Sequence, residues 1–440
     1  MKYDKFFNLA KEAGIEEAEL FISRSYSLSV SLFHGQIENN SMEDGMVVIA
    51  RGIVNGKFGS ARCDTYNAEK AKYLVKEIVS NAKVIENEDP VFIFEGSPKY
   101  KKIKTYNKEL DNIPLEQKLE ELFVLEKLIK EGDERIVEVA SVDYCESKTE
   151  TTIINSRGLN LHDKSNFFYY VGQAVAKLDT QTKSGFDLAF GNDFAKFDPE
   201  ELAKKVIKET VAQLGGEACE SKTYKAVLAP EVVAKFMNVL VNYANAESVQ
   251  KNSSLFIGKL NQKVVSKKIT ILDMPHNKTL FSRWFDDEGV STYNKPIIKN
   301  GVLSTYLYNL TTAAKDGVTT TGNALLGGSK MGVSPSFLLM KPGKKSQEEL
   351  FKDVNDGVYI TDIQGLHAGL NPQSGNFSLQ STGFLIKEGK IDRALDVITI
   401  SGNILTLFND VVSVGNDNKV LLGGASTPSL EIKRIAVSGK

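Results

Sequence analysis

The chain has 440 residues, of which 42% are hydrophobic and 25% charged, a balance typical of soluble globular proteins. So long a chain exceeds one ordinary hydrophobic core, and we expect two or three domains. The net charge of −2 and the small share of arginine, eight of the 54 basic residues, argue against direct nucleic-acid binding.

The sequence shows no signal for export or membrane insertion. No apolar run approaches the roughly 18 residues that a transmembrane helix requires. Residues 1–5, Met-Lys-Tyr-Asp-Lys, lack an apolar segment after their charges, so we expect no secretory signal and a cytoplasmic location. Cys63, Cys145 and Cys219 are widely spaced, and in a reducing compartment we expect them to be small buried residues rather than a reactive site.

The first half of the chain alternates between helical and strand-like patterns. Helices are expected over residues 2–13, 67–85, 114–131 and 198–215, strands over 17–62 and 135–190, and turns at 156–158 and 183–185. A polar linker covers residues 86–111. The order helix, strand meander, helix therefore occurs twice, over 2–87 and 114–214, which suggests an internal duplication.

The pattern changes near residue 223. One clear helix, over 230–245, precedes many short strand-like segments with glycine turns, which is typical of a β-rich region. We therefore expect an α+β protein. Its N-terminal α+β domain would cover residues 1–222, and its β-rich C-terminal domain would cover 223–440.

Four segments carry a family resemblance. They are Asp286-Asp287-Glu288-Gly289, Asn300-Gly301-Val302-Leu303, Thr321-Gly322-Asn323-Ala324 and the glycine-rich run over residues 364–378. With these segments the chain resembles the TldD/PmbA family along nearly its whole length, and it resembles the PmbA branch, also called TldE, most closely. The resemblance implies a cytoplasmic two-subunit peptidase in which TldD carries zinc and TldE is its partner. The same family was once described as modulating DNA gyrase.

Because of this resemblance, the helix expected over residues 230–245 decides whether the chain itself can bind zinc. In the TldD branch this segment carries the metal motif H-E-x-x-x-H, and counting back without a gap from the shared small-residue run over residues 252–258 places its three functional positions on Met237, Asn238 and Asn242. A thioether is too soft for zinc, carboxamides are poor ligands, and an amide cannot serve as a general base. Apolar residues also recur at helical spacing along this segment, so we expect one face of the helix, Met237 included, to pack against a core.

Other residues do not restore the zinc site that the resemblance implies. The cysteine that the metal-binding branch carries near its C-terminus is missing between Val414 and Pro428. His34, His162, His276 and His367 are far apart in sequence and lack the close spacing of a typical zinc motif. We therefore expect neither a metal nor another cofactor.

Two further motifs are open to a structural or a functional interpretation. Arg283, Asp286, Asp287 and Glu288 would form a turn whose carboxylates accept backbone amides, the interpretation that we favour, or would line a peptide groove. His367, Gly375 and Ser378 lie in the glycine-rich segment, which either connects two strands or forms a flexible cavity wall.

The function implied by the resemblance is that of a non-metallated subunit, inactive alone, which closes a peptide cavity beside the zinc of a TldD-type partner. Unfolded or leader-bearing peptides would be the substrates, and an extended peptide can bind by adding a strand to an exposed sheet edge. The alternative is a stand-alone homodimer that binds peptides or small ligands without hydrolysing them. Neither function involves nucleic acid or a membrane.

Overall fold

The computed structural model describes residues 3–86, 89–328 and 330–439. The first half contains α1 (Asp4–Glu12), β1 (Glu17–Phe33), β2 (Gln36–Val54), β3 (Lys57–Cys63), α2 (Ala68–Val84), the 3₁₀ helix η1 (Lys108–Asn112), α3 (Leu115–Glu131), β4 (Ile136–Asn155), β5 (Asn160–Leu178), β6 (Gln181–Gly191), η2 (Phe194–Lys196) and α4 (Pro199–Val211). The second half contains β7 (Lys222–Leu228), α5 (Pro230–Asn242), α6 (Ala246–Gln250), β8 (Ile271–Asp273), β9 (Lys295–Lys299), β10 (Val302–Leu303), α7 (Leu310–Asp316), β11 (Ala324–Gly327), β12 (Lys330–Val333), β13 (Leu338–Met340), α8 (Gln347–Val354), β14 (Gly357–Gln364), α9 (Leu366–Gly369), β15 (Asn376–Lys387), β16 (Lys390–Ala394), β17 (Ile398–Asn403), α10 (Ile404–Asn409), β18 (Val411–Val414), β19 (Lys419–Leu421), β20 (Ala425–Thr427) and β21 (Leu430–Ser438).

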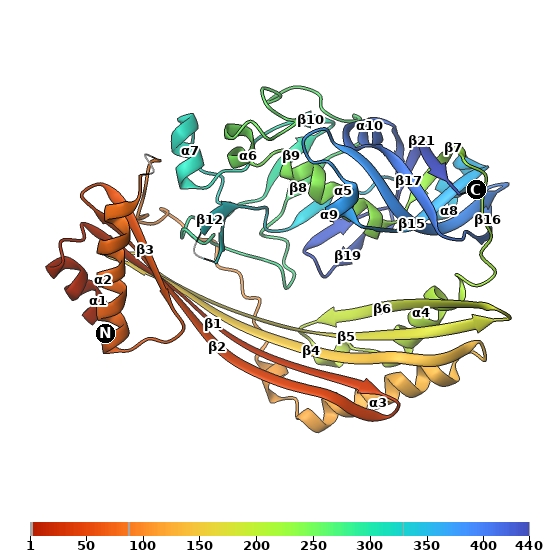
Figure 1. Cartoon of the computed structure of the whole chain (residues 1–440), viewed down its shortest axis with the longest axis horizontal. Helices are drawn as coiled ribbons and strands as arrows, with labels where there is room; N and C mark the ends of the chain where they lie inside the picture. Colours follow the sequence, from red (N-terminus) through yellow and green to blue (C-terminus); the bar gives the residue numbers. More distant parts are fainter. Residues whose placement is uncertain (1–2, 87–88, 329, 440) are drawn as a thin grey trace.

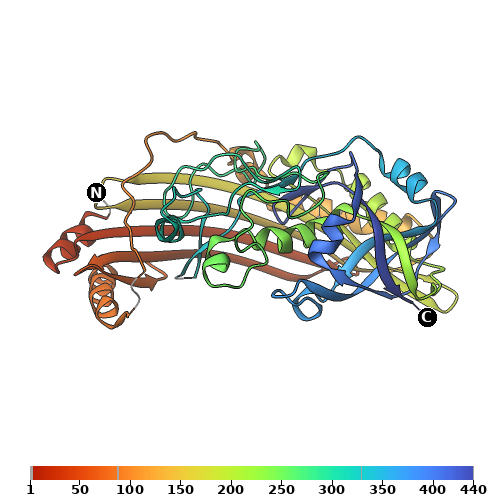
Figure 2. The same cartoon turned by 90° about the horizontal axis from the view of Figure 1, so that it is seen from above.

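Six antiparallel strands form a long sheet in the order β3-β2-β1-β4-β5-β6. Because side chains alternate along a strand, Leu20 and Ile22 of β1 point to one face of this sheet and Phe21 points to the other. The helices α1 and α2 cover the first face at one end, α3 and α4 cover it at the other end, and each pair encloses its own hydrophobic core. The sheet arches beneath the C-terminal region, which covers the opposite face along much of its length (Figures 1 and 2).

The predicted order of helices and strands occurs twice, as α1-β1-β2-β3-α2 and as α3-β4-β5-β6-α4. The two units meet where β1 pairs with β4. The turn predicted at residues 183–185 is wrong, because these residues lie within β6 and the β5–β6 turn is at Asp179 and Thr180. Gly185 instead allows β6 to pack closely against α4. A Cβ atom at this position would lie 2.7 Å from the Oγ1 atom of Thr210, in the last turn of α4.

From Lys222 onward the described strands form sheets separate from the long sheet. One has the order β10-β9-β8-β13-β20-β19, and another has the order β14-β7-β21-β17-β15-β16, with β18 paired to β21. Residues of both sheets and of α5 form the largest hydrophobic core. The predicted α+β class with a β-rich C-terminal region is confirmed, although the short helices α6 to α10 were not anticipated. The domain boundary at residue 222 stays a prediction.

The C-terminal region contacts the long sheet through two aromatic residues. Trp284 and Phe285, each 3% exposed, pack against Phe21, Ile49 and Ile153, which come from three neighbouring strands. Burial of large aromatic side chains makes this contact a major contribution to holding the two parts together. Among the described residues, no helix combines the length and the apolar composition that crossing a bilayer would require.

Candidate functional site

The helix α5 carries the positions of the implied zinc motif. Pro230 lies in its first turn, where a missing N–H is tolerated. The predicted apolar stripe is present, because Val233, Met237 and Leu240 are fully buried in the largest core. The helix ends at Asn242 rather than at residue 245, since Asn245 instead caps α6 by accepting a hydrogen bond from the Glu247 amide at 2.9 Å.

The three aligned positions do not converge on one point. Asn238 and Asn242 are exposed, and both line a cavity of about 230 Å³ against α5. Met237 lies in the core, away from this cavity. The cause is helical geometry, since residues four apart differ by about 40° around the helix axis and residues five apart by about 140°.

The residues around this cavity do not fit a zinc ion. Its polar side chains are carboxamides and a hydroxyl group, from Asn238, Asn242, Asn245 and Ser334, whereas zinc in proteins is bound by imidazole, thiolate or carboxylate. Over residues 3–86, 89–328 and 330–439, no group of three or more His, Cys, Asp or Glu side chains is arranged to hold a metal ion.

The four histidines are apart in space as well as in sequence. His34 faces Glu138 at 3.2 Å, and His162 forms a hydrogen bond with Thr152 at 3.0 Å. His276 lies in the loop before β9, with its Nε2 atom 3.1 Å from the Oγ1 atom of Thr292. His367 is exposed on the short helix α9 rather than in an irregular loop.

The carboxylate of Asp286 is saturated with backbone hydrogen bonds. It accepts from the amides of Glu288 at 3.0 Å, Val290 at 2.9 Å and Ala324 at 2.9 Å. Two of these donors follow Asp286 directly in sequence and close a turn, whereas Ala324 begins β11. Asp286 therefore ties the turn to a distant hairpin.

Asp287 makes a similar pair of connections. Its side chain forms an ion pair with Arg283, and its Oδ2 atom accepts from the amide of Leu326 at 2.7 Å. Arg283 lies just before the turn that contains Asp287, and Leu326 belongs to β11. This local geometry is the one expected if the Asp-Asp-Glu run is structural, with carboxylates that accept hydrogen bonds from backbone amides.

Glu288 reaches the boundary with the long sheet. It is 7% exposed, and its Oε2 atom accepts from the amide of Leu310 at 2.8 Å, at the start of α7. Burial, and then the neighbouring Asp286 carboxylate, raise the pKa of Glu288 to about 8, although Leu310 and Arg51 oppose this shift. Arg51 is itself buried and forms an ion pair with Glu19, which lies directly opposite it on β1.

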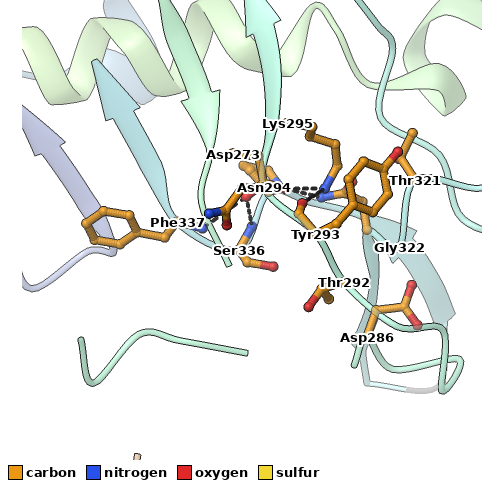
Figure 3. A network of polar contacts seen from close by, with 12 residues as sticks. Asp273, Asp286, Thr292, Tyr293, Asn294, Lys295, Thr321, Gly322, Ser336 and Phe337 are labelled. Atoms are coloured by element: carbon orange, nitrogen blue, oxygen red, sulfur yellow. Dashed lines mark hydrogen bonds and ion pairs between the residues drawn. The ribbon is translucent and has the colours of Figure 1, made fainter. Parts of the chain in front are cut away.

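A second buried charge network was not predicted from the sequence. Asp273 and Lys295, 0% and 4% exposed, form an ion pair at 3.0 Å between β8 and β9 (Figure 3). Asp273 also accepts from the amide of Ser336 at 2.9 Å and from the side chain of Asn323 at 2.8 Å. A single aspartate and a single lysine 22 residues apart form no motif, so only the pairing of β8 with β9 reveals them.

The second predicted motif, the glycine-rich segment over residues 364–378, does not belong to these charge networks. Gly375, in the connection between β14 and β15, has a φ of +75°, and a Cβ atom there would lie 3.0 Å from Leu255. Ser378 is exposed on β15. His367, Gly375 and Ser378 do not line the cavity on α5.

Comparisons with protein families match three consecutive parts of the chain. The PmbA/TldA metallopeptidase domain 1 matches residues 18–82, the central domain of the same proteins matches 108–214, and their C-terminal domain matches 221–439. A metalloprotease PmbA homologue of Buchnera aphidicola is 28% identical, over 96% of this chain and 93% of the relative. A zinc metalloprotease TldD homologue of Saccharolobus solfataricus is 27% identical over 57% of this chain and 59% of the relative.

Solved structures agree with this relationship. A Thermotoga maritima protein, whose name links it to modulation of a DNA gyrase, is 32% identical with a TM-score of 0.91, over 99% of both chains. TldE of Thermococcus kodakarensis has the same fold, with a TM-score of 0.92 over 100% of both chains and 23% identity. Because the matched family domains extend over most of the chain, this protein belongs to the PmbA/TldD family.

Proposed function

We propose that this chain is the non-metallated, PmbA/TldE-type subunit of a cytoplasmic peptidase complex whose zinc belongs to a TldD-type partner. The observation that carries the proposal is the chemistry of α5. Its cavity-facing positions hold Asn238 and Asn242, and Met237 is buried behind them. A neutral amide neither binds zinc well nor accepts a proton near neutral pH.

The relatives support a role in peptide cleavage. Their names include metalloproteases PmbA and zinc metalloprotease TldD homologues. We propose that unfolded peptides are cleaved at the partner's zinc, and that this subunit contributes a wall of the chamber around them. An extended peptide would reach such a site by pairing its backbone with an exposed strand.

The proposal is tested by expressing the chain alone and together with a TldD-type subunit from the same genome. We expect the purified chain alone to contain substoichiometric zinc by elemental analysis and to leave an unfolded peptide intact. The complex should cleave that peptide, and a chelator should stop it. The matched control is a complex in which the histidines of the partner's H-E-x-x-x-H motif are replaced by alanine. Chelator-sensitive cleavage by the chain alone would refute the proposal.

A second candidate is a stand-alone homodimer that binds peptides or small ligands without hydrolysis. The cavity on α5 favours it, since the amides of Asn238 and Asn242 can both donate and accept hydrogen bonds with a peptide backbone. A genome without a relative that carries H-E-x-x-x-H, together with a homodimer in solution, would favour this function over the complex.

A further inference from the structure

A larger cavity, of about 750 Å³, lies where the linker, the long sheet and the C-terminal region meet. Its walls come from the linker after α2, from the β4–β5 turn with the start of β5, and from Trp284. The lining residues are Glu95, Gly96, Ser97, Pro98, Tyr100, Lys102, Gly158, Leu159, Asn160, Leu161, His162 and Trp284. None of them lines the cavity on α5, so the two sites are distinct.

One wall of this cavity is held rigidly by hydrogen bonds between the linker and the C-terminal region. The hydroxyl group of Tyr100 donates to the carbonyl of Gly289 at 2.7 Å and accepts from the amide of Ser97 at 2.8 Å. The amide of Ser291 donates to the Oγ atom of Ser97 at 2.9 Å. The rings of Tyr100 and Trp284 meet edge to face, with centroids 5.7 Å apart. The cavity is therefore preformed, which lowers the entropy lost on binding.

The linker brings a strong positive charge to this wall. Four of the six residues from Lys99 to Lys104 are lysines, and all four are exposed. In the part of the chain that the structure describes, none of these four lysines belongs to an ion pair shown by the geometry. Lys102 lines the cavity itself, with its Nζ atom 5.6 Å from the centre of the Trp284 ring.

Glu95 is the one carboxylate among the residues that line the cavity, and it is paired with an arginine that also pairs with Glu17. This arginine is Arg157, which forms the ion pair with Glu95 at 2.6 Å. Asp163 does not line the cavity; burial raises the pKa of its carboxyl, and a hydrogen bond with the Trp284 side chain opposes this shift. Among the residues that line the cavity, the charged side chain without an ion-pair partner is therefore the cation Lys102.

We propose that this cavity binds an acidic peptide segment. Residues 91–104 form neither helix nor strand, so an extended ligand can run beside them, and six extended residues span about 20 Å. A carboxylate of such a peptide would meet Lys102 inside the cavity, further carboxylates would meet the other exposed lysines outside it, and the partly exposed ring of Tyr100 provides apolar contact. A nucleic acid fits less well, because the cavity wall contains no arginine, the side chain best suited to bidentate contact with phosphate. The inference is independent of the proposed function.

The test uses the full chain and an octapeptide of alternating glycine and glutamate, labelled with fluorescein. The matched peptides carry the same label, with glutamine or lysine in place of glutamate. We expect fluorescence anisotropy to show saturable binding of the glutamate peptide only. An unlabelled glutamate peptide should also change the intrinsic fluorescence of the chain, which reports on this cavity because Trp284 is the only tryptophan.

Two variants localise the binding. Lys102→Gln should weaken binding of the glutamate peptide by about tenfold, because it removes the charge that lines the cavity. Lys57→Gln, at an exposed lysine of β3, is the matched control and should leave the affinity unchanged. The proposal is wrong if the glutamate peptide gives no anisotropy change, if Lys102→Gln binds it as tightly as the unmodified chain, or if a single-stranded oligonucleotide of equal charge binds more tightly.

Discussion

Glu288 and Arg51 approach each other from opposite sides of the boundary between the C-terminal region and the long sheet, and each affects the pKa of the other. Burial disfavours the charge on Arg51, but Glu19 and then Glu288 raise its pKa. The negative charge on Glu288 is less favoured than the positive charge on Arg51, because burial and the nearby Asp286 raise the pKa of Glu288 to about 8. The charged groups of this boundary are Glu19, Arg51, Arg283, Asp286, Asp287 and Glu288.

This boundary should make folding sensitive to pH. Between about pH 4.5, where an unfolded glutamate titrates, and about pH 8, the folded chain retains a proton on Glu288 that the unfolded chain has released. The free energy of unfolding should therefore fall as the pH rises through this window. Asp286, whose pKa burial raises to about 6, adds to the fall in the lower part of the window.

The variant Glu288→Gln should lose this contribution. Its amide oxygen still accepts from Leu310, but it does not titrate, so the variant should be stabilised relative to the unmodified chain at pH 8, by on the order of a few kcal/mol. Urea unfolding at pH 5, 6.5 and 8 measures the difference. Glu134→Gln, at an exposed carboxylate, is the control. Equal pH slopes for Glu288→Gln and the unmodified chain would contradict this account.

The orientation of α5 predicts different zinc binding for two variants that introduce histidines into this helix. In the triple variant M237H/N238E/N242H the first imidazole would point into the core, so we expect poor zinc binding and a loss of about 2–5 kcal/mol in stability. In N238H/N242H both imidazoles would face the cavity one helical turn apart, the spacing that zinc-binding helices use.

Isothermal titration with zinc should therefore show tighter binding for N238H/N242H than for the triple variant, and the double variant should exceed N242H alone by about tenfold. Because only two ligands are supplied, its affinity should stay below that of a complete structural site. Tight, stoichiometric zinc in the triple variant would show that Met237 does not face the core.

The aromatic contact between the C-terminal region and the sheet should be worth several kcal/mol. Trp284→Ala leaves a void among Phe21, Ile49 and Ile153, and we expect it to lower the free energy of unfolding by about 3–5 kcal/mol. Denaturant unfolding measures the loss. Phe123→Ala, at a phenylalanine that is 41% exposed on α3, should cost about 1 kcal/mol or less. Similar losses for the two variants would argue against a dominant role for Trp284.

Because the backbone packs closely around Gly59, an alanine there should cost far more stability than an alanine at Gly191. A Cβ atom at Gly59 of β3 would lie 2.1 Å from the carbonyl oxygen of Ile78 in α2, so Gly59→Ala must separate helix and strand, at about 2–3 kcal/mol or more. At Gly191 the nearest atom would be 3.9 Å away, and Gly191→Ala should change stability by about 0.5 kcal/mol or less. Thermal unfolding of the two variants compares them directly; equal midpoints would contradict the packing argument.

Much of the secondary structure follows from local sequence. Asn67 accepts from the amides of Glu69 and Lys70 and begins α2 as predicted, and Leu122, Leu125 and Ile129 of α3 are buried at their helical spacing. These features depend on residues within about one helical turn of each other, which is the range over which sequence patterns are informative. The misplaced turn at residues 183–185 shows the limit, because Gly185 is explained by α4, 25 residues further along the chain.

By itself, the sequence determined the class of the fold, the helix α5 and the residue types at its three aligned positions, because periodicity and side-chain chemistry are local properties. Only the tertiary structure decided that Asn238 and Asn242 share a cavity without Met237, that Asp273 meets Lys295, and that Lys102 of the linker lies beside Trp284. Such contacts join residues far apart in the chain, so the sequence around either residue does not show which partner it meets.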